Sequence, residues 1–156
     1  MENSFFCTAL VPGNDQAHFC KPADVAVLAN GDFFVADGYC NARVVKFSKS
    51  GQFLAEWTST GGASFSVVHS LALHEKQNLL CVADRENALV HCFDLAGTHL
   101  FEVSVAQFGP VYGVAFASGN GSVLYAVNSP HSRGDANSPV QLVLISTSDC
   151  LLYTSR

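Results

Sequence analysis

The sequence predicts an all-β chain of repeated four-stranded units, and three observations support this prediction. Short apolar runs rich in Val, Leu and Phe alternate with Asn-Gly, Ser-Gly and Ala-Gly turns, and no helical periodicity is present. One segment occurs twice, as DVAVLANGDFFVADGYCNARVVKFSKSGQFLAEW from Asp24 and as SLALHEKQNLLCVADRENALVHCFDLAGTHLFEV from Ser70. A weaker third copy, YGVAFASGNGSVLYAVNS, starts at Tyr112. Four strands in a repeat of roughly 40 to 50 residues are typical of a β-propeller blade.

The turns of the second copy place its strands. We expect them at Ser70–Leu73, Leu79–Ala83, Leu89–Phe93 and Thr98–Val103. An all-β sandwich would explain short strands but not the repeat, so the propeller is preferred. The expected organisation is a remnant of a preceding blade or linker at 1–17, blades at 18–64 and 65–107, a degraded partial blade at 108–150, and a tail at 151–156.

Composition excludes several classes of protein. Hydrophobic residues make up 49% of the chain and charged residues 13%, which is too apolar for a disordered chain. The net charge of -5 provides no basic patch for nucleic acid. No apolar run approaches the roughly 18 residues of a membrane-spanning helix, and the start, MENSFFCTALVPG, does not have the pattern of a signal peptide. Six cysteines nevertheless fit an oxidising compartment.

One disulfide follows from hairpin register. Cys81 and Cys92 lie equally far from a turn at Glu86-Asn87, so they are directly opposed on antiparallel strands. Opposed residues have Cα atoms about 4.5–5.5 Å apart, which is within the range that a disulfide accepts. The alternative is a pair of buried free thiols.

Blade topology also brings residues of different repeats together. The start of each first strand and each turn between the second and third strands lie at the same end of a blade. Tyr39, His69 and Arg85 should therefore meet at one mouth of the propeller, where loops usually carry function. The alternative for each is structural: a satisfied polar histidine, a packed tyrosine and a surface ion pair of Arg85 with Glu86.

Cysteine positions add to this picture. A Cys20–Cys40 disulfide is feasible at the same mouth and would clamp the loop that carries Tyr39. Cys7 and Cys150 have no evident partner.

Five segments carry a resemblance to a known family: HFCKPADVAV, DGYCNARVVKFSKSGQFLAEW, VHSLAL, LCVADRENALVHCF and AVNSPHSRGDANSPVQ. Together they resemble the NHL-repeat lyase domain of the peptide-amidating enzymes, peptidyl-α-hydroxyglycine α-amidating lyase, which is often joined to a copper monooxygenase. The resemblance covers nearly the whole chain. Asn41 and Arg43 match the pattern too, with no role assigned.

The resemblance implies a zinc-dependent lyase that converts C-terminally α-hydroxyglycine-extended peptides to peptide amides and glyoxylate. It implies that His69 is one of three zinc-ligand histidines, that Tyr39 and Arg85 are the catalytic tyrosine and arginine, and that the disulfides are Cys20–Cys40 and Cys81–Cys92. A cation beside a phenol favours the phenolate, so zinc and Arg85 would prepare Tyr39 to take the proton of the substrate hydroxyl.

The chain departs from the family in ways that matter for activity. The segments that carry the other two zinc ligands and the structural calcium site are absent, and the remaining histidines do not match ligand positions: His18, His74, His91, His99 and His131. Val68 replaces the usual proline before the ligand histidine, and the linker TSTGGASF is short. We therefore expect two to three blades of an expected six, from a fragment or truncated product that is inactive alone.

Three further expectations remain. The complete protein belongs to the secretory pathway lumen or the extracellular space. A non-catalytic NHL-repeat segment that serves binding or assembly is the alternative function, followed by a translated fragment without function. Asn120-Gly121-Ser122 is a possible glycosylation site in the turn of the third repeat.

Overall fold

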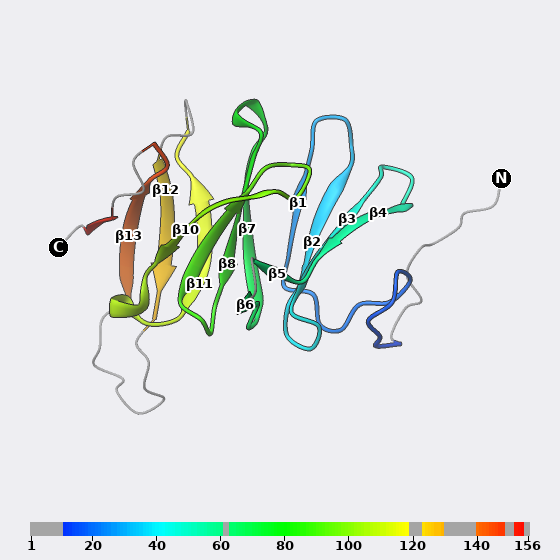
Figure 1. The fold of residues 1–156 in the computed structure, drawn as a ribbon, viewed down its shortest axis with the longest axis horizontal. Coiled ribbons are helices and arrows are strands. Elements are labelled where there is room, and N and C mark those ends of the chain that lie inside the picture. The colour runs from blue at the N-terminus through cyan, green and yellow to red at the C-terminus, as the bar shows by residue number, and fades with distance from the viewer. Residues whose placement is uncertain (1–10, 61–62, 119–122, 130–139, 149–151, 155–156) are drawn as a thin grey trace.

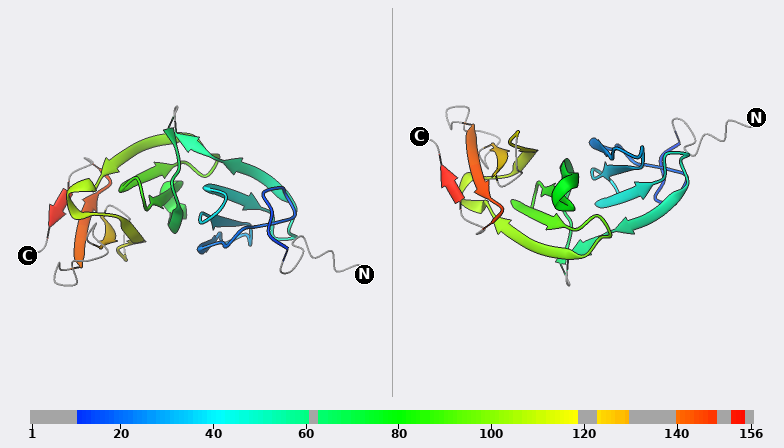
Figure 2. Two further views of the ribbon diagram at one scale, coloured as in Figure 1. Left: turned by 90° about the horizontal axis from the view of Figure 1, so that it is seen from below. Right: turned by 90° about the horizontal axis from the view of Figure 1, so that it is seen from above.

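Three four-stranded antiparallel sheets follow one another along the chain (Figure 1). The computed structural model describes residues 11–60, 63–118, 123–129, 140–148 and 152–154. Figure 2 shows the three sheets side by side along an open arc. The first strand of the middle sheet contacts the first strands of both neighbours, as expected for blades arranged around an axis. The prediction of an incomplete β-propeller is therefore confirmed.

The three sheets are called the first, middle and last blade. The first blade comprises β1 (Asp24–Val27), β2 (Phe33–Asp37), β3 (Arg43–Phe47) and β4 (Phe53–Trp57). The middle blade comprises β7 (Val68–His74), β8 (Leu79–Asp84), β9 (Leu89–Phe93) and β10 (His99–Ser104). The last blade comprises β11 (Val111–Phe116), β12 (Val123–Asn128), β13 (Gln141–Ser146) and β14 (Leu152–Thr154).

Short elements connect the blades and strands. The hairpin of β5 (Ser59–Thr60) and β6 (Ala63–Ser64) joins the first blade to the middle one, and 3-10 turns lie at η1 (Glu75–Gln77) and η2 (Ala106–Phe108). The strand β14 pairs with β13 and lies where the sequence suggested a tail. Among the described residues, no helix combines the length and the apolar character that crossing a bilayer requires.

Two apolar layers fill the spaces between blades. The layer between the first and middle blades contains Phe34, Val44, Leu80, Val82 and Phe93. The layer between the middle and last blades contains residues such as Val90, Val114, Leu124, Val143 and Ile145. Because side chains alternate along a strand, the middle blade contributes one of its faces to each layer.

A tight turn of the middle blade locks onto the first blade. Gly97 has φ +98°, a conformation that favours glycine, and a Cβ atom there would lie 2.2 Å from the indole nitrogen of Trp57. Trp57 in turn stacks on Phe93, with ring centroids 5.3 Å apart. The Ala-Gly turn noted in the sequence is therefore a packing requirement between blades.

An aspartate at the end of the second strand recurs in two blades. Asp37 and Asp84 are buried, and each accepts hydrogen bonds from the backbone N–H of the preceding linker and from an asparagine in the following turn. The last blade has Asn128 at this position, which donates to the carbonyl of Gly109. The repeated Val-Ala-Asp therefore fastens each incoming linker to its blade.

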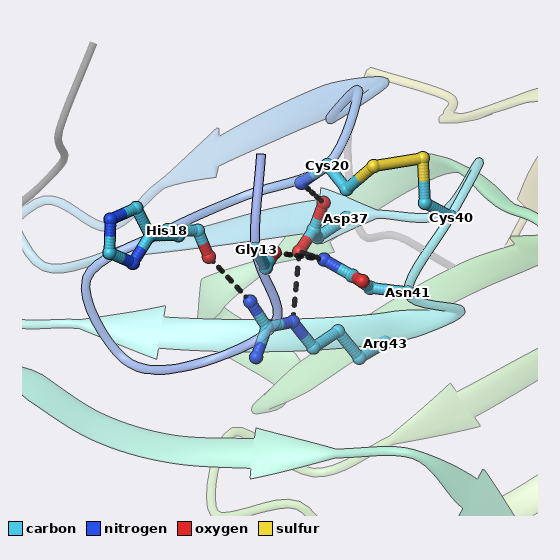
Figure 3. The surroundings of a disulfide bond; sticks show 7 residues. All are labelled: Gly13, His18, Cys20, Asp37, Cys40, Asn41 and Arg43. Atoms are coloured by element: carbon cyan, nitrogen blue, oxygen red, sulfur yellow. Dashed lines mark hydrogen bonds and ion pairs between the residues drawn. A yellow bond between two sulfur atoms is a disulfide. The ribbon is translucent and has the colours of Figure 1, made fainter. Parts of the chain in front are cut away.

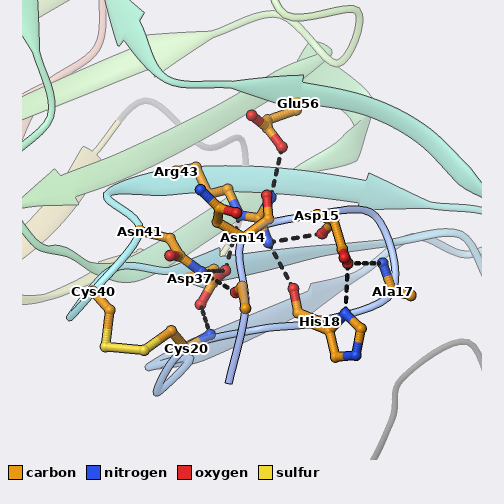
Figure 4. A network of polar contacts seen from close by, with 11 residues as sticks. Asn14, Asp15, Ala17, His18, Cys20, Asp37, Cys40, Asn41, Arg43 and Glu56 are labelled. Atoms are coloured by element: carbon orange, nitrogen blue, oxygen red, sulfur yellow. Dashed lines mark hydrogen bonds and ion pairs between the residues drawn. A yellow bond between two sulfur atoms is a disulfide. The ribbon is translucent and has the colours of Figure 1, made fainter. Parts of the chain in front are cut away.

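Arg43 fastens the N-terminal loop to the first blade (Figure 4). Its guanidinium is buried, lies 2.8 Å from carboxylate oxygens of both Asp37 and Glu56, and donates to the backbone carbonyls of three loop residues, Asn14, Asp15 and His18. Asn41 donates to Asp37 and to the carbonyl of Gly13. The two residues that matched the family without a role are thus structural.

Candidate functional site

Tyr39, His69 and Arg85 lie together at one end of the first and middle blades. Tyr39 stands in the β2–β3 turn, His69 in β7 and Arg85 in the β8–β9 turn. The phenol oxygen lies 3.0 Å from Nε2 of His69, and Arg85 donates to it from Nη1 at 3.2 Å. Tyr39 is 47% exposed, so the phenol is open to solvent. The structure places these three residues as the blade topology suggested.

A close backbone approach sets the distance between the two blades here. A Cβ atom on Gly38 would lie 1.8 Å from the carbonyl oxygen of Val68. Only glycine lets the β2–β3 turn come this near to the start of β7. Tyr39 and His69, the residues that follow Gly38 and Val68, are brought into contact as a result.

His69 is the extra residue of a β-bulge. Val68 pairs with Asp84 and Ser70 with the neighbouring Ala83, so His69 has no partner across the ladder. Bulges redirect a side chain, and they are frequent beside active sites. Tyr112 occupies the same kind of bulge at the start of β11.

The last blade fixes the orientation of the His69 ring. Nδ1 of His69 lies 2.7 Å from the backbone carbonyl oxygen of Tyr112. A carbonyl only accepts hydrogen bonds, so Nδ1 carries the proton, and Nε2 of the neutral ring faces the Tyr39 hydroxyl with its lone pair. An imidazole that donates from one nitrogen to a carbonyl and keeps the other lone pair available is the usual arrangement of a metal-binding histidine.

Arg85 is held between two tyrosine rings and a carboxylate. Its guanidinium carbon lies 5.1 Å from the ring centroid of Tyr39 and 5.3 Å from that of Tyr112. Burial opposes its charge, but the hydrogen bond and negative charge of Glu86 outweigh burial, so the pKa of Arg85 lies above its usual value. The cluster therefore contains a permanent cation that touches a phenol.

The disulfide beside Tyr39 ties its turn to the N-terminal loop (Figure 3). Cys20 and Cys40 are bonded with Cα atoms 5.3 Å apart, and the backbone N–H of Cys20 donates to Asp37. The second disulfide, Cys81–Cys92, joins directly paired residues of β8 and β9, with Cα atoms 4.1 Å apart. Both pairings that the sequence suggested are present.

A zinc ion fits His69 by the chemistry of its ring, but the residues that the structure describes provide one ligand there. His18 bonds to Asp15, and the His74 ring packs on Phe116. In the described part of the chain, the group of three or more metal-ligand side chains lies elsewhere and does not include His69. A surface hollow of about 610 Å³ is likewise lined by other residues, in the N-terminal loop and β4.

Four residues that the sequence singled out lie outside the described residues: Cys7, Cys150, Asn120 and His131. Conversely, no sequence motif marks Tyr112 as part of the site. Its contribution to His69 comes from a backbone carbonyl, which leaves no signal in the residue type. Tyr112 opens the third repeat at the position equivalent to that of His69, and this equivalence is the one clue the sequence offered.

Comparisons with known proteins agree with this architecture. Residues 19–47 match the NHL repeat. The chain is 41% identical over 150 residues to peptidyl-glycine α-amidating monooxygenase B of Xenopus laevis, covering 90% of this chain. It is 54% identical over 88 residues to a probable peptidyl-α-hydroxyglycine α-amidating lyase of Caenorhabditis elegans, covering 54% of this chain.

The chain corresponds to a part of these proteins. It spans 17% of the frog protein and 25% of the nematode protein. Among solved structures, RRP9 WD40 repeats align over 85% of this chain and 37% of that chain with a TM-score of 0.67. At 18% identity, this likeness supports the propeller fold alone.

Proposed function

We propose that this chain, which is homologous to part of the peptidyl-α-hydroxyglycine α-amidating lyases, is a segment of such a lyase and carries part of its active site. The proposed reaction converts a peptidyl-α-hydroxyglycine to a peptide amide and glyoxylate. The observation that carries the proposal is the contact of Tyr39 with both His69 and Arg85.

The chemistry needs a group that takes a proton from a hydroxyl. In the substrate, the O–H and C–N bonds break, the C=O bond of glyoxylate forms, and the departing amide nitrogen receives a proton. We infer that Tyr39 takes the hydroxyl proton, a role that the hydrogen bond from the Arg85 guanidinium to its phenol oxygen supports. His69 holds Nε2 toward the same oxygen.

Zinc bound to Nε2 of His69 would polarise the substrate oxygen. A catalytic zinc site uses three protein ligands and an open position. Because His69 is one ligand, we infer that the 156-residue chain is inactive alone and that other segments of the complete lyase supply the rest. The two disulfides favour the secretory pathway as its compartment, and a monooxygenase joined to the lyase is the proposed partner.

The terminal blades support a longer propeller. On the first blade, Val25 pairs with Val35, whose apolar cluster lies on the face turned away from the middle blade. The side chain of Val25 on that face is 55% exposed. Val127 and Leu142 pair on the corresponding face of the last blade and are also exposed. These apolar faces suit further blades. They also suit assembly with another chain, which is the alternative function.

Release of glyoxylate by the complete lyase protein tests the proposal. We expect Tyr39→Phe to lower kcat by about 100-fold or more, since general acid–base groups contribute about 10²- to 10⁴-fold. Tyr125→Phe, a change on β12, is the matched control and should keep full activity. Unchanged kcat in Tyr39→Phe would reject the role of Tyr39. No turnover in the complete protein, with self-association of the 156-residue chain, would support the assembly function instead.

A further inference from the structure

A group of three metal-ligand side chains lies on the outer strands of the middle blade. His91 is in β9, and His99 and Glu102 are in β10. Their ligand atoms all lie within 4.8 Å of one another. None of the three contributes to the Tyr39 cluster, and the proposed lyase chemistry does not use them.

A β-bulge places the three side chains on one face. Residues three apart on a regular strand point to opposite faces, so His99 and Glu102 would normally diverge. Here the register shifts between His99 and Phe101, so that His99 pairs with Phe93 while Glu102 pairs with His91. Phe93 and His91 are two residues apart on β9 and share a face. His99 and Glu102 therefore face the same side as His91.

Two imidazole nitrogens in this group have no hydrogen bond. His91 is 1% exposed, and its Nδ1 lies 3.3 Å from a carboxylate oxygen of Glu102 in a geometry that makes no hydrogen bond. Nε2 of His99 is shielded from solvent and also has no hydrogen-bond partner. Leaving buried polar atoms without partners is costly, so the pair calls for a ligand that accepts two nitrogen lone pairs.

The surroundings suit a bound cation. A carboxylate oxygen of Asp84 lies 3.5 Å from Nε2 of His91, on the far side of the ring from Glu102. Carboxylates in this position orient histidines that bind metals through the other nitrogen. Glu102 is half exposed and can adjust its position.

The first blade shows what this position looks like without such a group. Val45 stands where the middle blade has His91, because each is opposite a glutamate, Glu56 or Glu102. Phe53, the bulge-preceding residue of β4, corresponds to His99. Two apolar residues of one blade are thus replaced by two imidazoles in the other, next to a carboxylate that both blades have. The need of Asp84 for a partner explains His91 but not His99.

We propose that His91, His99 and Glu102 form a binding site for a divalent transition-metal ion of the zinc type. Two imidazole nitrogens and one carboxylate oxygen are a regular zinc donor set, and water completes the coordination. Zinc bonds of about 2.0–2.2 Å require the three donors to draw closer than they stand, which the exposed glutamate allows. The ion joins β10, the outermost strand, to β9, independently of the site at His69.

Titration of the 156-residue chain with Zn²⁺ by calorimetry, and with Co²⁺ by visible absorption, tests this proposal. We expect one tight site with the absorption of tetrahedral cobalt bound to nitrogen and oxygen. His99→Phe and His91→Val introduce the residues of the first blade and should keep the fold. Each should weaken binding by more than about 100-fold, since outer partners of metal sites alone contribute about 10- to 100-fold. Glu102→Gln, at an exposed position, should weaken it by at least about 10-fold.

His18→Gln, which changes a histidine of the N-terminal loop outside both sites, is the matched control and should leave the binding unchanged. Circular dichroism and the fluorescence of Trp57 report whether each variant folds. Absence of Zn²⁺ binding, or binding that survives His99→Phe and Glu102→Gln, would overturn the proposal. Loss of binding in His69→Gln alone would also overturn it and would assign the ion to the Tyr39 cluster. If His91→Val does not fold, Glu102→Gln still decides the outcome.

Discussion

The first and middle blades use an equivalent pair of carboxylates in opposite ways. In the first blade, Arg43 lies 2.8 Å from both Asp37 and Glu56 and closes the group as an ion-pair network. The equivalent carboxylates of the middle blade are Asp84 and Glu102. A permanent cation between two carboxylates leaves nothing to bind, so the first blade gains only structure at this position.

The middle blade replaces that cation with an imidazole. Leu89 stands at the position of Arg43, and the ring of His91 lies 3.5 Å from Asp84 and 3.3 Å from Glu102. An imidazole can be neutral and can offer a lone pair, which a guanidinium cannot. Two blades with the same pair of carboxylates therefore differ in what they can bind. A guanidinium closes the first pair as an ion-pair network, whereas an imidazole leaves the second pair with a free nitrogen donor.

The largest expected effect comes from giving the first blade the residue of the middle one. Arg43→Leu leaves Asp37 as a buried charge without its cation and should lower the free energy of unfolding by about 3–5 kcal/mol. Urea unfolding followed by Trp57, the single tryptophan, measures this. Asp37→Asn combined with Arg43→Leu should recover part of the loss. A loss below about 1 kcal/mol in the single variant would show that Asp37 does not depend on Arg43.

The contact between blades at the Tyr39 cluster is tested by adding a methyl group. Gly38→Ala drives a Cβ atom into the carbonyl of Val68 and should cost about 1–3 kcal/mol. It should also separate Tyr39 from His69, which the NMR signals of the imidazole ring report. Gly113→Ala, where nothing lies within 4 Å, is the control and should change stability by less than about 0.5 kcal/mol. Equal effects of the two changes would contradict this explanation.

The Asn-Ala turns of the first and middle blades provide a third comparison, with a smaller expected effect on stability. Ala42 and Ala88 have φ of 49° and 51°, a conformation that costs an alanine about 1–2 kcal/mol. Ala42→Gly should stabilise the chain by up to about 1 kcal/mol, because glycine's greater unfolded freedom offsets part of the relief. Ala88→Gly should be close to neutral, since its methyl group is buried and is worth about 0.8 kcal/mol. Thermal unfolding measures the stability of the two variants. A larger stabilisation by Ala88→Gly than by Ala42→Gly would contradict this explanation.

The smallest expected effect is a slope in the pH dependence of stability. Burial, and then His91, lower the pKa of His99, so the unfolded chain binds this proton first as pH falls below about 6.5. The contribution of His99 is complete above that pH and is lost as pH falls through the folded pKa. The negative charge of Glu102 works against this shift. Urea midpoints should fall less steeply in His99→Phe than in the natural chain, and an identical slope would contradict the assignment.

Local chemistry explains what the sequence could predict. The Cys81–Cys92 pairing follows from counting outward from one turn, because hairpin register is set by the turn. The meeting of Tyr39 with His69 and Arg85 follows from the direction of successive strands. Strand β7 is longer than expected, from Val68 to His74, because its bulge extends the pairing.

Non-local register explains what the sequence could not predict. His99 and Glu102 are three residues apart, a spacing that predicts opposite faces of a regular strand. Only the bulge between them brings both side chains to one face. The role of Arg43 depends on carbonyls of a loop nearly thirty residues away, and carbonyls are common to all residues.

The hydrogen bond between His69 and the backbone carbonyl of Tyr112 makes the orientation of the imidazole depend on the position of the last blade. No substitution at position 112 can delete that acceptor, since every amino acid brings one. Only displacement of β11 can release the imidazole. The orientation of the His69 ring therefore depends on whether the last blade is packed against the middle one. A substitution that displaces the last blade would release this ring and so weaken its contact with Tyr39.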